Sequence, residues 1–245
     1  MSLDYLSLFA ADAEAFSAAI ETGPPEAEIA GCPGWTLPEL GTHLGVIHRW
    51  ARAAILTGAV PQMDPASDPA PDDLAGIAGW VRAGAARLST TLHELDPQQP
   101  TWHPFLVEPK VAGLWRRRQA QEASVHRWDA QRAVGLTPTI GAEFASDGID
   151  EYWTVMLPRV ITRQKLAVPA SVFATETTDT GGRWVVDGTG GTFSLAAEGL
   201  TPSALLRGDA ESVLLRLWGR PVPDGSVDVS GDGGVADDWL ALGGA

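Results

Sequence analysis

Cysteine is nearly absent from this sequence: Cys32 is the only one among 245 residues. A single thiol excludes an intramolecular disulfide, an internal redox pair and a zinc site made of cysteine thiolates. Cys32 precedes Pro33 and Gly34 at the approach to a predicted helix, and we interpret it as a small packed side chain rather than a nucleophile. A reaction that needs a thiol would therefore take it from outside the chain.

Long apolar runs are missing as well. No segment approaches about 18 uninterrupted apolar residues, so we expect no membrane span. The N-terminal stretch MSLDYLSLFAADAEAF carries acidic residues and lacks the basic start of a secretory signal, which predicts a cytoplasmic protein. The oligomeric state, monomer or homodimer, is left open by the sequence.

Basic residues are few, with 17 Lys and Arg against 31 Asp and Glu and a formal net charge of -14. Phosphate binding needs a concentrated basic face, so we expect no nucleic-acid partner. The one arginine cluster, residues 116–118, points in three directions around a helix and is interpreted as a mostly solvated face. Within it, Arg118 is placed to pair with Glu122, four residues further on, or with an anionic substrate.

Hydrophobic periodicity and helix-ending residues predict an α+β fold. Four segments of about 20 residues read as helices of a bundle, at about Leu3 to Thr22, Leu37 to Thr57, Asp72 to Leu95 and Val111 to Val134. A further helix is expected near Asp147 to Arg163. After Lys165, short β-branched stretches between Gly and Thr clusters predict a small antiparallel sheet, followed by a helix at about Asp209 to Trp218, a strand at Val227 to Val229 and a helix at about Val235 to Leu242. The predicted domains are a helical bundle over residues 1–165 and a smaller α/β domain over residues 166–245.

The chemistry-bearing residues stand mainly in the segment QAQEASVHRWDAQRA. Glu122 and His126 are four residues apart on a predicted helix, so both side chains can close on one divalent metal such as zinc. Asp129, one turn beyond, could orient a ligand or receive a proton. The same spacing also occurs on exposed helices as a mild side-chain interaction, so this motif alone leaves both interpretations open.

A second helix carries another histidine. Thr36 and Glu39 form the pattern of a capping box, which predicts a helix start at Leu37. Apolar neighbours then place His43 on an inward face, either as a core histidine bonded to a carbonyl or as a third metal ligand. Three protein ligands leave a fourth position open, as in catalytic zinc sites. His48, five residues later, points away from this set.

The runs CPGWTLPELGTHLGVIHRWA and RRRQAQEASVHRWDAQRAVG resemble the N-terminal domain of the mycothiol-dependent maleylpyruvate isomerase family, a DinB-like metal-binding four-helix bundle. The later run GDAESVLLRLWGR resembles the C-terminal domain of that family. The resemblance implies a zinc site at His43, Glu122 and His126, mycothiol as the thiol, and an active-site arginine at Arg220. Otherwise Arg220 is a surface residue that serves the end of a helix.

As the resemblance implies, such a protein adds a low-molecular-weight thiol to a small electrophilic substrate. It then acts as a cis-trans isomerase or, if the adduct is kept, as a thiol S-transferase. One alternative is a zinc hydrolase with Asp129 as general base, and another is a non-catalytic small-molecule-binding protein. The Pro- and Asp-rich loop GAVPQMDPASDPAPDD is expected to cover the entrance of the site.

Overall fold

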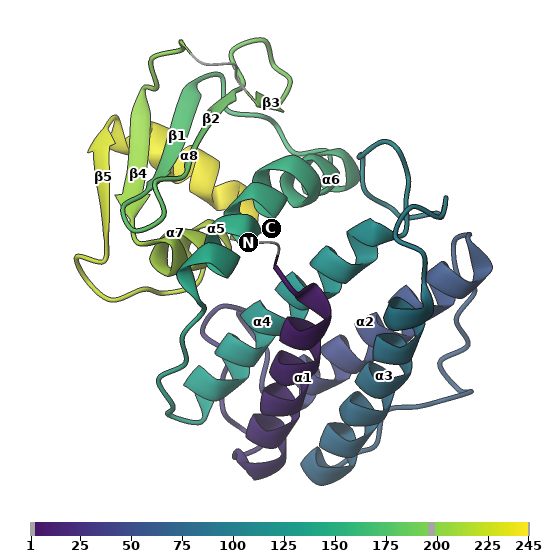
Figure 1. Cartoon of the computed structure of the whole chain (residues 1–245). Coiled ribbons are helices and arrows are strands. Elements are labelled where there is room, and N and C mark those ends of the chain that lie inside the picture. Colours follow the sequence, from purple (N-terminus) through teal and green to yellow (C-terminus); the bar gives the residue numbers. More distant parts are fainter. Residues whose placement is uncertain (1–2, 196–198, 245) are drawn as a thin grey trace. The chain divides into compact units, whose positions relative to one another are not determined.

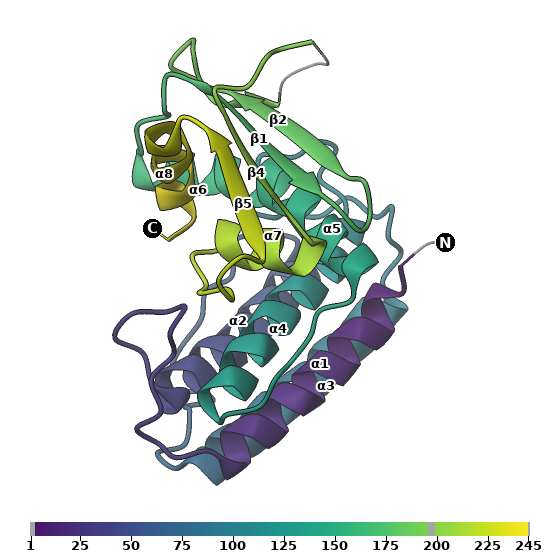
Figure 2. The ribbon, with the colours of Figure 1, turned by 90° about the vertical axis from the view of Figure 1, so that its left-hand side faces the viewer.

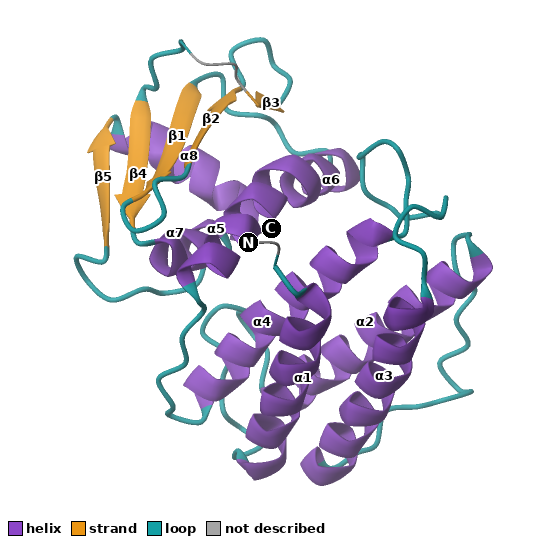
Figure 3. Cartoon of the chain, in the orientation of Figure 1, coloured by secondary structure: helices purple, strands orange, loops and turns teal. Residues whose placement is uncertain are grey.

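The computed structural model describes residues 3–195 and 199–244, and the chain forms two compact units (Figure 1). The first unit comprises Met1–His103 and Glu108–Thr139, and the second comprises Pro104–Val107 and Ile140–Ala245. The expected fold class is confirmed, because the first unit is a bundle of helices α1–α4 and the second combines helices with a five-stranded sheet (Figure 3). Among the described residues, no helix is long and apolar enough to cross a membrane.

The bundle helices begin and end close to where the sequence predicts. They are α1 (Tyr5–Thr22), α2 (Leu37–Thr57), α3 (Leu74–Glu94) and α4 (Gly113–Ala133). The expected capping box is present at α2, where the amide of Thr36 donates to Glu39 Oε2 over 2.9 Å. Asp73 caps α3 in a related way by accepting from the amide of Gly76 over 2.8 Å. Satisfied first-turn amides explain why these helix starts are readable from sequence.

Two glycines of α2 let α3 approach its backbone closely. A Cβ added at Gly41 would lie 2.5 Å from Ile77, and one added at Gly45 would lie 2.0 Å from the ring of Trp80. Both are shorter than any normal carbon contact, so larger residues would push the helices apart. Helices α1 and α4 also pack against each other, as do α1 and α3, and Figure 2 shows α1 beside α4, with α3 largely hidden behind α1. The close α2–α3 contact fixes the helix that carries His43.

The second unit begins with one nearly continuous helical segment. Helix α5 (Ala142–Glu151) passes through a wider π-helical turn, η1 (Tyr152–Met156), into α6 (Leu157–Gln164). Pro158 stands at the start of α6, where its ring would meet the carbonyl of the preceding α-helical turn. We attribute the wider turn to that clash.

The sheet has the order β3-β2-β1-β4-β5. Its strands are β1 (Val172–Thr177), β2 (Arg183–Asp187), β3 (Ser194–Leu195), β4 (Ala204–Gly208) and β5 (Val227–Gly231). Helices α7 (Ala210–Leu217) and α8 (Gly233–Ala241) pack against β1 and β4. The unit's core is aromatic, with Trp153, Phe173 and Trp239 all fully buried.

Two sequence predictions about this unit need correction. The sheet is not purely antiparallel, because β1 and β4 run parallel, with Thr175 opposite Leu206. Strand β4 itself was not expected, since its residues ALLRG merge into the helix signal that follows. Residues 140–165 belong to the second unit. The domain boundary at 165/166, drawn where helix texture changes to strand texture, stays a prediction.

Candidate metal centre

Helices α2 and α4 run antiparallel and face each other along their length. At one end, His43 lies opposite Glu122, with Nε2 3.2 Å from Oε1. Seven residues further along α2 and seven earlier along α4, Trp50 meets Trp115 with ring centroids 5.7 Å apart. The aromatic pair lies seven residues from the polar pair on both helices. Helices α2 and α4 therefore keep one register from the polar pair to the aromatic pair.

Three side chains converge at the polar end. Glu122 Oε1 lies 3.2 Å from His43 Nε2 and 3.5 Å from His126 Nε2, and the two imidazole centroids are 5.0 Å apart. All three are partly buried. The structure thus brings together the residues that the sequence singles out, on the helices expected to carry them.

The electrostatics of this cluster favour a cation between the carboxylate and the imidazoles. Burial works to raise the pKa of Glu122, but hydrogen bonds with His126 and His43 and the charge of Arg118 hold that pKa well below its usual range. Burial likewise works to lower the pKa of His126, but hydrogen bonds with Asp129 and Glu122 raise it above the ordinary value. The carboxylate is therefore ionised, and the ring facing it attracts a proton.

The two separations between Glu122 Oε1 and the histidine nitrogens also fit a tetrahedral zinc ion. With ligand bonds of about 2.0–2.1 Å, tetrahedral ligand atoms stand roughly 3.3–3.4 Å apart. The separations of 3.2 and 3.5 Å at Glu122 Oε1 bracket that value. In addition, when neutral His126 keeps its proton on Nδ1, the lone pair of Nε2 points at the carboxylate of Glu122. The nitrogen and the carboxylate oxygen are then both acceptors, so a proton or a metal ion must lie between them.

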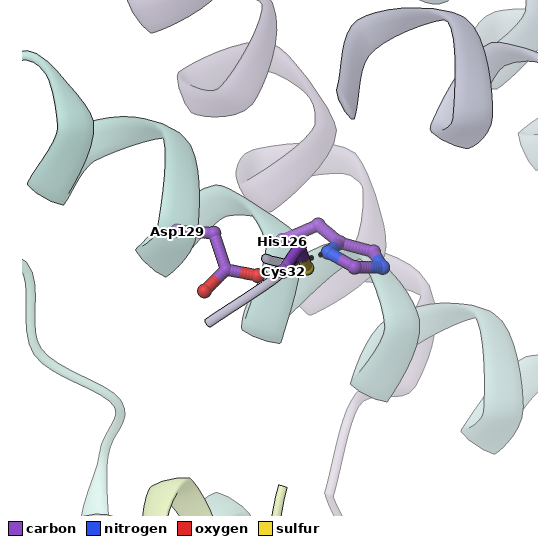
Figure 4. A group of neighbouring side chains, drawn as sticks. All are labelled: Cys32, His126 and Asp129. Atoms are coloured by element: carbon purple, nitrogen blue, oxygen red, sulfur yellow. Dashed lines mark hydrogen bonds and ion pairs between the residues drawn. The ribbon is translucent and has the colours of Figure 1, made fainter. Parts of the chain in front are cut away.

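The other face of His126 has its own partners. Nδ1 lies 3.0 Å from Asp129 Oδ2, and Asp129 is buried. Cys32 joins this side, because its sulfur and the ligand atoms of His126 and Asp129 all lie within 4.8 Å of one another. Figure 4 shows the sulfur and the carboxylate on the same side of the ring. The sequence excludes a zinc site made of cysteine thiolates, and this group is a different case, because it combines one sulfur with an imidazole and a carboxylate.

The turn CPGW explains how Cys32 and Trp35 reach the site. The amide of Trp35 donates to the carbonyl of Cys32 over 3.0 Å, with Pro33 and Gly34 between them. Gly34 has φ +83°, as the third position of a type II turn requires. A further backbone bond of 2.9 Å joins Ile29 to Trp35. The turn places the indole of Trp35 4.9 Å from the ring of His43.

The interpretation of the arginine cluster as a mostly solvated face was wrong for Arg118. Its side chain is 5% exposed, and Nη2 donates to Glu122 Oε2 over 2.8 Å. Arg116 is also engaged, since Nε donates to the carbonyl of Leu92 over 2.9 Å and Nη2 to that of Leu95 over 2.7 Å. Arg118 thus holds one oxygen of Glu122 and leaves the other facing the histidines.

A cavity of about 580 Å³ opens beside His43. It is lined by Trp35, Pro38, Glu39, Thr42, His43, Pro71, Asp72 and Ile77. Pro71 and Asp72 end the Pro- and Asp-rich loop, which is tied down by Asp68: Arg49 Nε donates to it over 2.7 Å and Trp80 Nε1 over 2.9 Å. The loop therefore forms one wall of a cavity at the histidine.

Two other expected features lie outside the cluster. His48 does point away from it, into the core, where it is fully buried with its ring 5.2 Å from that of Phe9. Burial lowers the pKa of His48 to about 3, so it is neutral at physiological pH. His103, in the connection between α3 and α4, is also buried.

Arg220 belongs to the second unit. It follows α7 and is 6% exposed, so it is not a surface residue as the alternative interpretation assumed. Its amide donates to the carbonyl of Leu215 over 2.9 Å, and Nη1 donates to the carbonyl of Trp218 over 2.8 Å. The guanidinium therefore does contact the end of α7.

Comparison with known proteins gives two family matches and two related structures. Residues 6–131 match the mycothiol maleylpyruvate isomerase N-terminal domain, and residues 143–238 match the C-terminal domain of the same family. Two crystal structures of mycothiol-dependent maleylpyruvate isomerase, one of them a histidine-to-alanine mutant, superpose with TM-scores of 0.57 and 0.59. They share 15% and 13% sequence identity and cover 93% of this chain and 92% of theirs, a likeness that shows the fold alone. No curated protein sequence gave a significant match.

Proposed function

This chain belongs to the mycothiol maleylpyruvate isomerase family, and on that premise we propose that it is a zinc-dependent enzyme whose nucleophile is an external thiol, mycothiol. The observation that carries the proposal is the convergence of His43 and His126 on one oxygen of Glu122. The interpretation of Cys32 as a packed side chain agrees with a nucleophilic thiol that comes from solution.

His43, Glu122 and His126 would hold the ion. When bound, zinc supplies a deprotonated thiol at neutral pH. Arg118 keeps the carboxylate of Glu122 ionised and oriented, through its contact of 2.8 Å. Asp129 fixes the proton of His126 on Nδ1, so that Nε2 presents its lone pair.

The substrate in this proposal is a small molecule with an activated cis double bond, such as an unsaturated diacid. The thiolate sulfur forms a bond to one alkene carbon, and the double bond becomes single. Rotation about that bond and loss of the same thiolate restore the double bond in the trans form. An adduct that is protonated and released instead makes the protein a thiol S-transferase. Both outcomes use the same residues.

Arg220 is proposed to bind a carboxylate of the substrate or thiol through its planar guanidinium. The competing role is structural, and the bond from Nη1 to the carbonyl of Trp218 supports it. Arg220→Lys separates the two. If Arg220 binds a carboxylate, catalytic efficiency falls by roughly 30-fold to 1,000-fold at unchanged melting temperature. If the role is structural, the melting temperature falls and the efficiency per folded molecule stays constant.

A hydrolase that activates water at the same ion is the alternative, and it needs Asp129 as a free general base. The contact of 3.0 Å between Asp129 and His126 favours an orienting role instead. The decisive experiment is metal analysis of the purified protein, followed by a screen of electrophiles with and without mycothiol, read by mass spectrometry. Adducts or isomers that form only with the thiol support the proposal. Substrate loss that needs metal but no thiol would contradict it.

A further inference from the structure

Cys32, His126 and Asp129 form a second group of metal-ligating side chains next to the candidate centre at Glu122. The Cys32 sulfur, a ring nitrogen of His126 and a carboxylate oxygen of Asp129 all lie within 4.8 Å of one another. Figure 4 shows the sulfur and the carboxylate beside one nitrogen of the ring, with the other nitrogen pointing away from them. The proposed function uses neither the sulfur nor this ring nitrogen as a metal ligand.

The two nitrogens of His126 serve different groups. Nε2 lies 3.5 Å from Glu122 Oε1, whereas Nδ1 lies 3.0 Å from Asp129 Oδ2. Either nitrogen of an imidazole can bind a metal ion, and their lone pairs point in diverging directions. A cation at Nδ1 therefore leaves the position between Nε2 and Glu122 open to the first ion.

We propose that Cys32, His126 Nδ1 and Asp129 bind a second metal ion, a thiophilic divalent cation such as zinc or cadmium. Zinc accepts sulfur, nitrogen and oxygen ligands together, and a thiolate favours soft ions. A thiolate and a carboxylate carry two negative charges, which balance a divalent cation in a partly buried place. Binding replaces the thiol proton of Cys32 and the Nδ1 proton of His126, and both protons pass to solvent.

The sulfur distinguishes this position from the first centre. The set of His43, Glu122 and His126 offers only nitrogen and oxygen atoms, whereas the set at Cys32 adds a soft ligand. Softer ions than zinc, such as cadmium, therefore prefer the Cys32 position. This difference in ligand type makes the two positions separable by experiment.

The three ligands are held in place without an ion. The amide of Cys32 donates to the carbonyl of Ile29 over 2.9 Å, and the carbonyl of Cys32 accepts from the amide of Trp35 over 3.0 Å. Asp129 is 2% exposed and lies three residues after His126 on α4. Such a preformed group loses little conformational entropy when it binds an ion.

An ion can reach the group from the side of the turn. Cys32 is half-buried, and the two residues that follow it, Pro33 and Gly34, are exposed. Three protein ligands also leave the fourth place of a tetrahedral ion to water. The position thus has both the ligands and the entry path that a metal site requires.

A cadmium titration of the full-length protein tests the proposal without turnover. Two signals are read: the ultraviolet charge-transfer absorption of a thiolate bound to cadmium, and the cadmium bound per chain by mass spectrometry. Nitrogen and oxygen ligands do not give this absorption. The test variants are Cys32→Ser and Asp129→Asn. Ala30→Ser, at an exposed position of the same loop, is the matched control, and His43→Ala removes the first centre while leaving the second group intact.

We expect the parent, Ala30→Ser and His43→Ala to show the absorption, saturating at one absorbing ion per chain. Cys32→Ser should lose it, and Asp129→Asn should bind the absorbing ion about 10-fold to 100-fold more weakly. No absorption in the parent would overturn the proposal. An unchanged affinity in Asp129→Asn would also overturn it, because the thiol alone would then bind cadmium. Loss of the absorption in His43→Ala would make Cys32 a ligand of the first ion and would equally contradict a second position.

Discussion

Helices α3 and α4 are each 21 residues long and belong to the same bundle, yet α3 buries almost only apolar side chains, whereas α4 buries apolar and polar side chains together. The inward face of α3 is apolar, with Ile77, Ala78, Trp80, Val81, Ala85, Leu88 and Leu92 buried. The buried residues of α4 include Arg118, Gln119, Gln121, Arg127 and Asp129. One helix contributes apolar surface to the core, and the other carries charge into it.

The difference shows that stability and chemistry are separated by helix. Burying charged side chains costs free energy unless each finds a partner. On α4 the partners are present: Arg127 Nε donates to Asp12 Oδ1 over 3.0 Å and Nη2 to the carbonyl of Thr139 over 2.9 Å. The buried polar side chains of α4 are thus held in fixed positions, where they can take part in chemistry, whereas α3 mainly supplies packing.

The strongest test of this separation replaces one histidine on each helix. We expect His126→Ala, on α4, to lose stoichiometric zinc and about 1,000-fold or more of catalytic efficiency, because two ligands cannot hold the ion. His93→Ala is the control on α3, where the exposed ring contacts the carbonyl of Ser89 over 3.0 Å. Zinc content by mass spectrometry and turnover with mycothiol are the measurements. Full zinc occupancy in His126→Ala would remove α4 from the site.

The reverse test truncates the packing of α3. Leu88 is fully buried, so Leu88→Ala should lower the free energy of unfolding by roughly 2–5 kcal/mol. Zinc bound per folded chain should stay at the parent value, because Leu88 lies outside the ligand cluster. Leu56→Ala, at a position 59% exposed, is the control and should change stability by less than about 0.5 kcal/mol. Urea denaturation followed by circular dichroism measures both.

A third prediction concerns Asp129, which lies on α4 and contacts His126. In Asp129→Asn the amide oxygen still accepts from Nδ1 of His126, but the charge is gone. We expect turnover to fall about 10-fold to 100-fold, with a smaller loss of metal content. Kinetics and metal analysis on the same preparation measure the two effects. Parent-level turnover would leave Asp129 with a structural role only.

The smallest expected effect is on the pH dependence of stability, and it comes from His48, a buried histidine on α2. Because burial lowers the pKa of His48 to about 3, the unfolded chain, with an ordinary histidine pKa of about 6.5, binds a proton at pH 5 that the native state does not. This contribution is complete above pH 6.5 and is lost progressively as the pH falls toward 3. Between pH 7 and pH 5 it amounts to about 2 kcal/mol. Urea titrations at both values should show this difference shrinking in His48→Gln; an unchanged pH dependence would contradict the assignment.

Much of the first unit was readable from sequence because its signals are local. The bounds of α2 follow from Thr36, Glu39 and Gly58, which act within a turn of the helix ends. The pairing of Glu122 with His126 needs only helical spacing. In contrast, the approach of His43 to Glu122 joins residues 79 positions apart. The residues alone left it as one of two interpretations of His43, and only the family resemblance favoured it.

What the sequence did not predict depends on contacts between distant segments. The burial of Arg118 and the arrival of Cys32 at His126 both follow from packing that no local pattern encodes. Strand β4 was missed for a related reason. Its pairing with β1 in a parallel ladder is a long-range contact, and its five residues stand next to a stronger helix signal.

The candidate centre forms only when α2 and α4 have the correct antiparallel register. A slip of one helical turn displaces the chain by about 5.4 Å, far more than a bond of about 2 Å to an ion tolerates. The same slip would part Trp50 from Trp115, which now meet at 5.7 Å. A bundle with shifted helices would therefore lose the geometry that the proposed metal site requires.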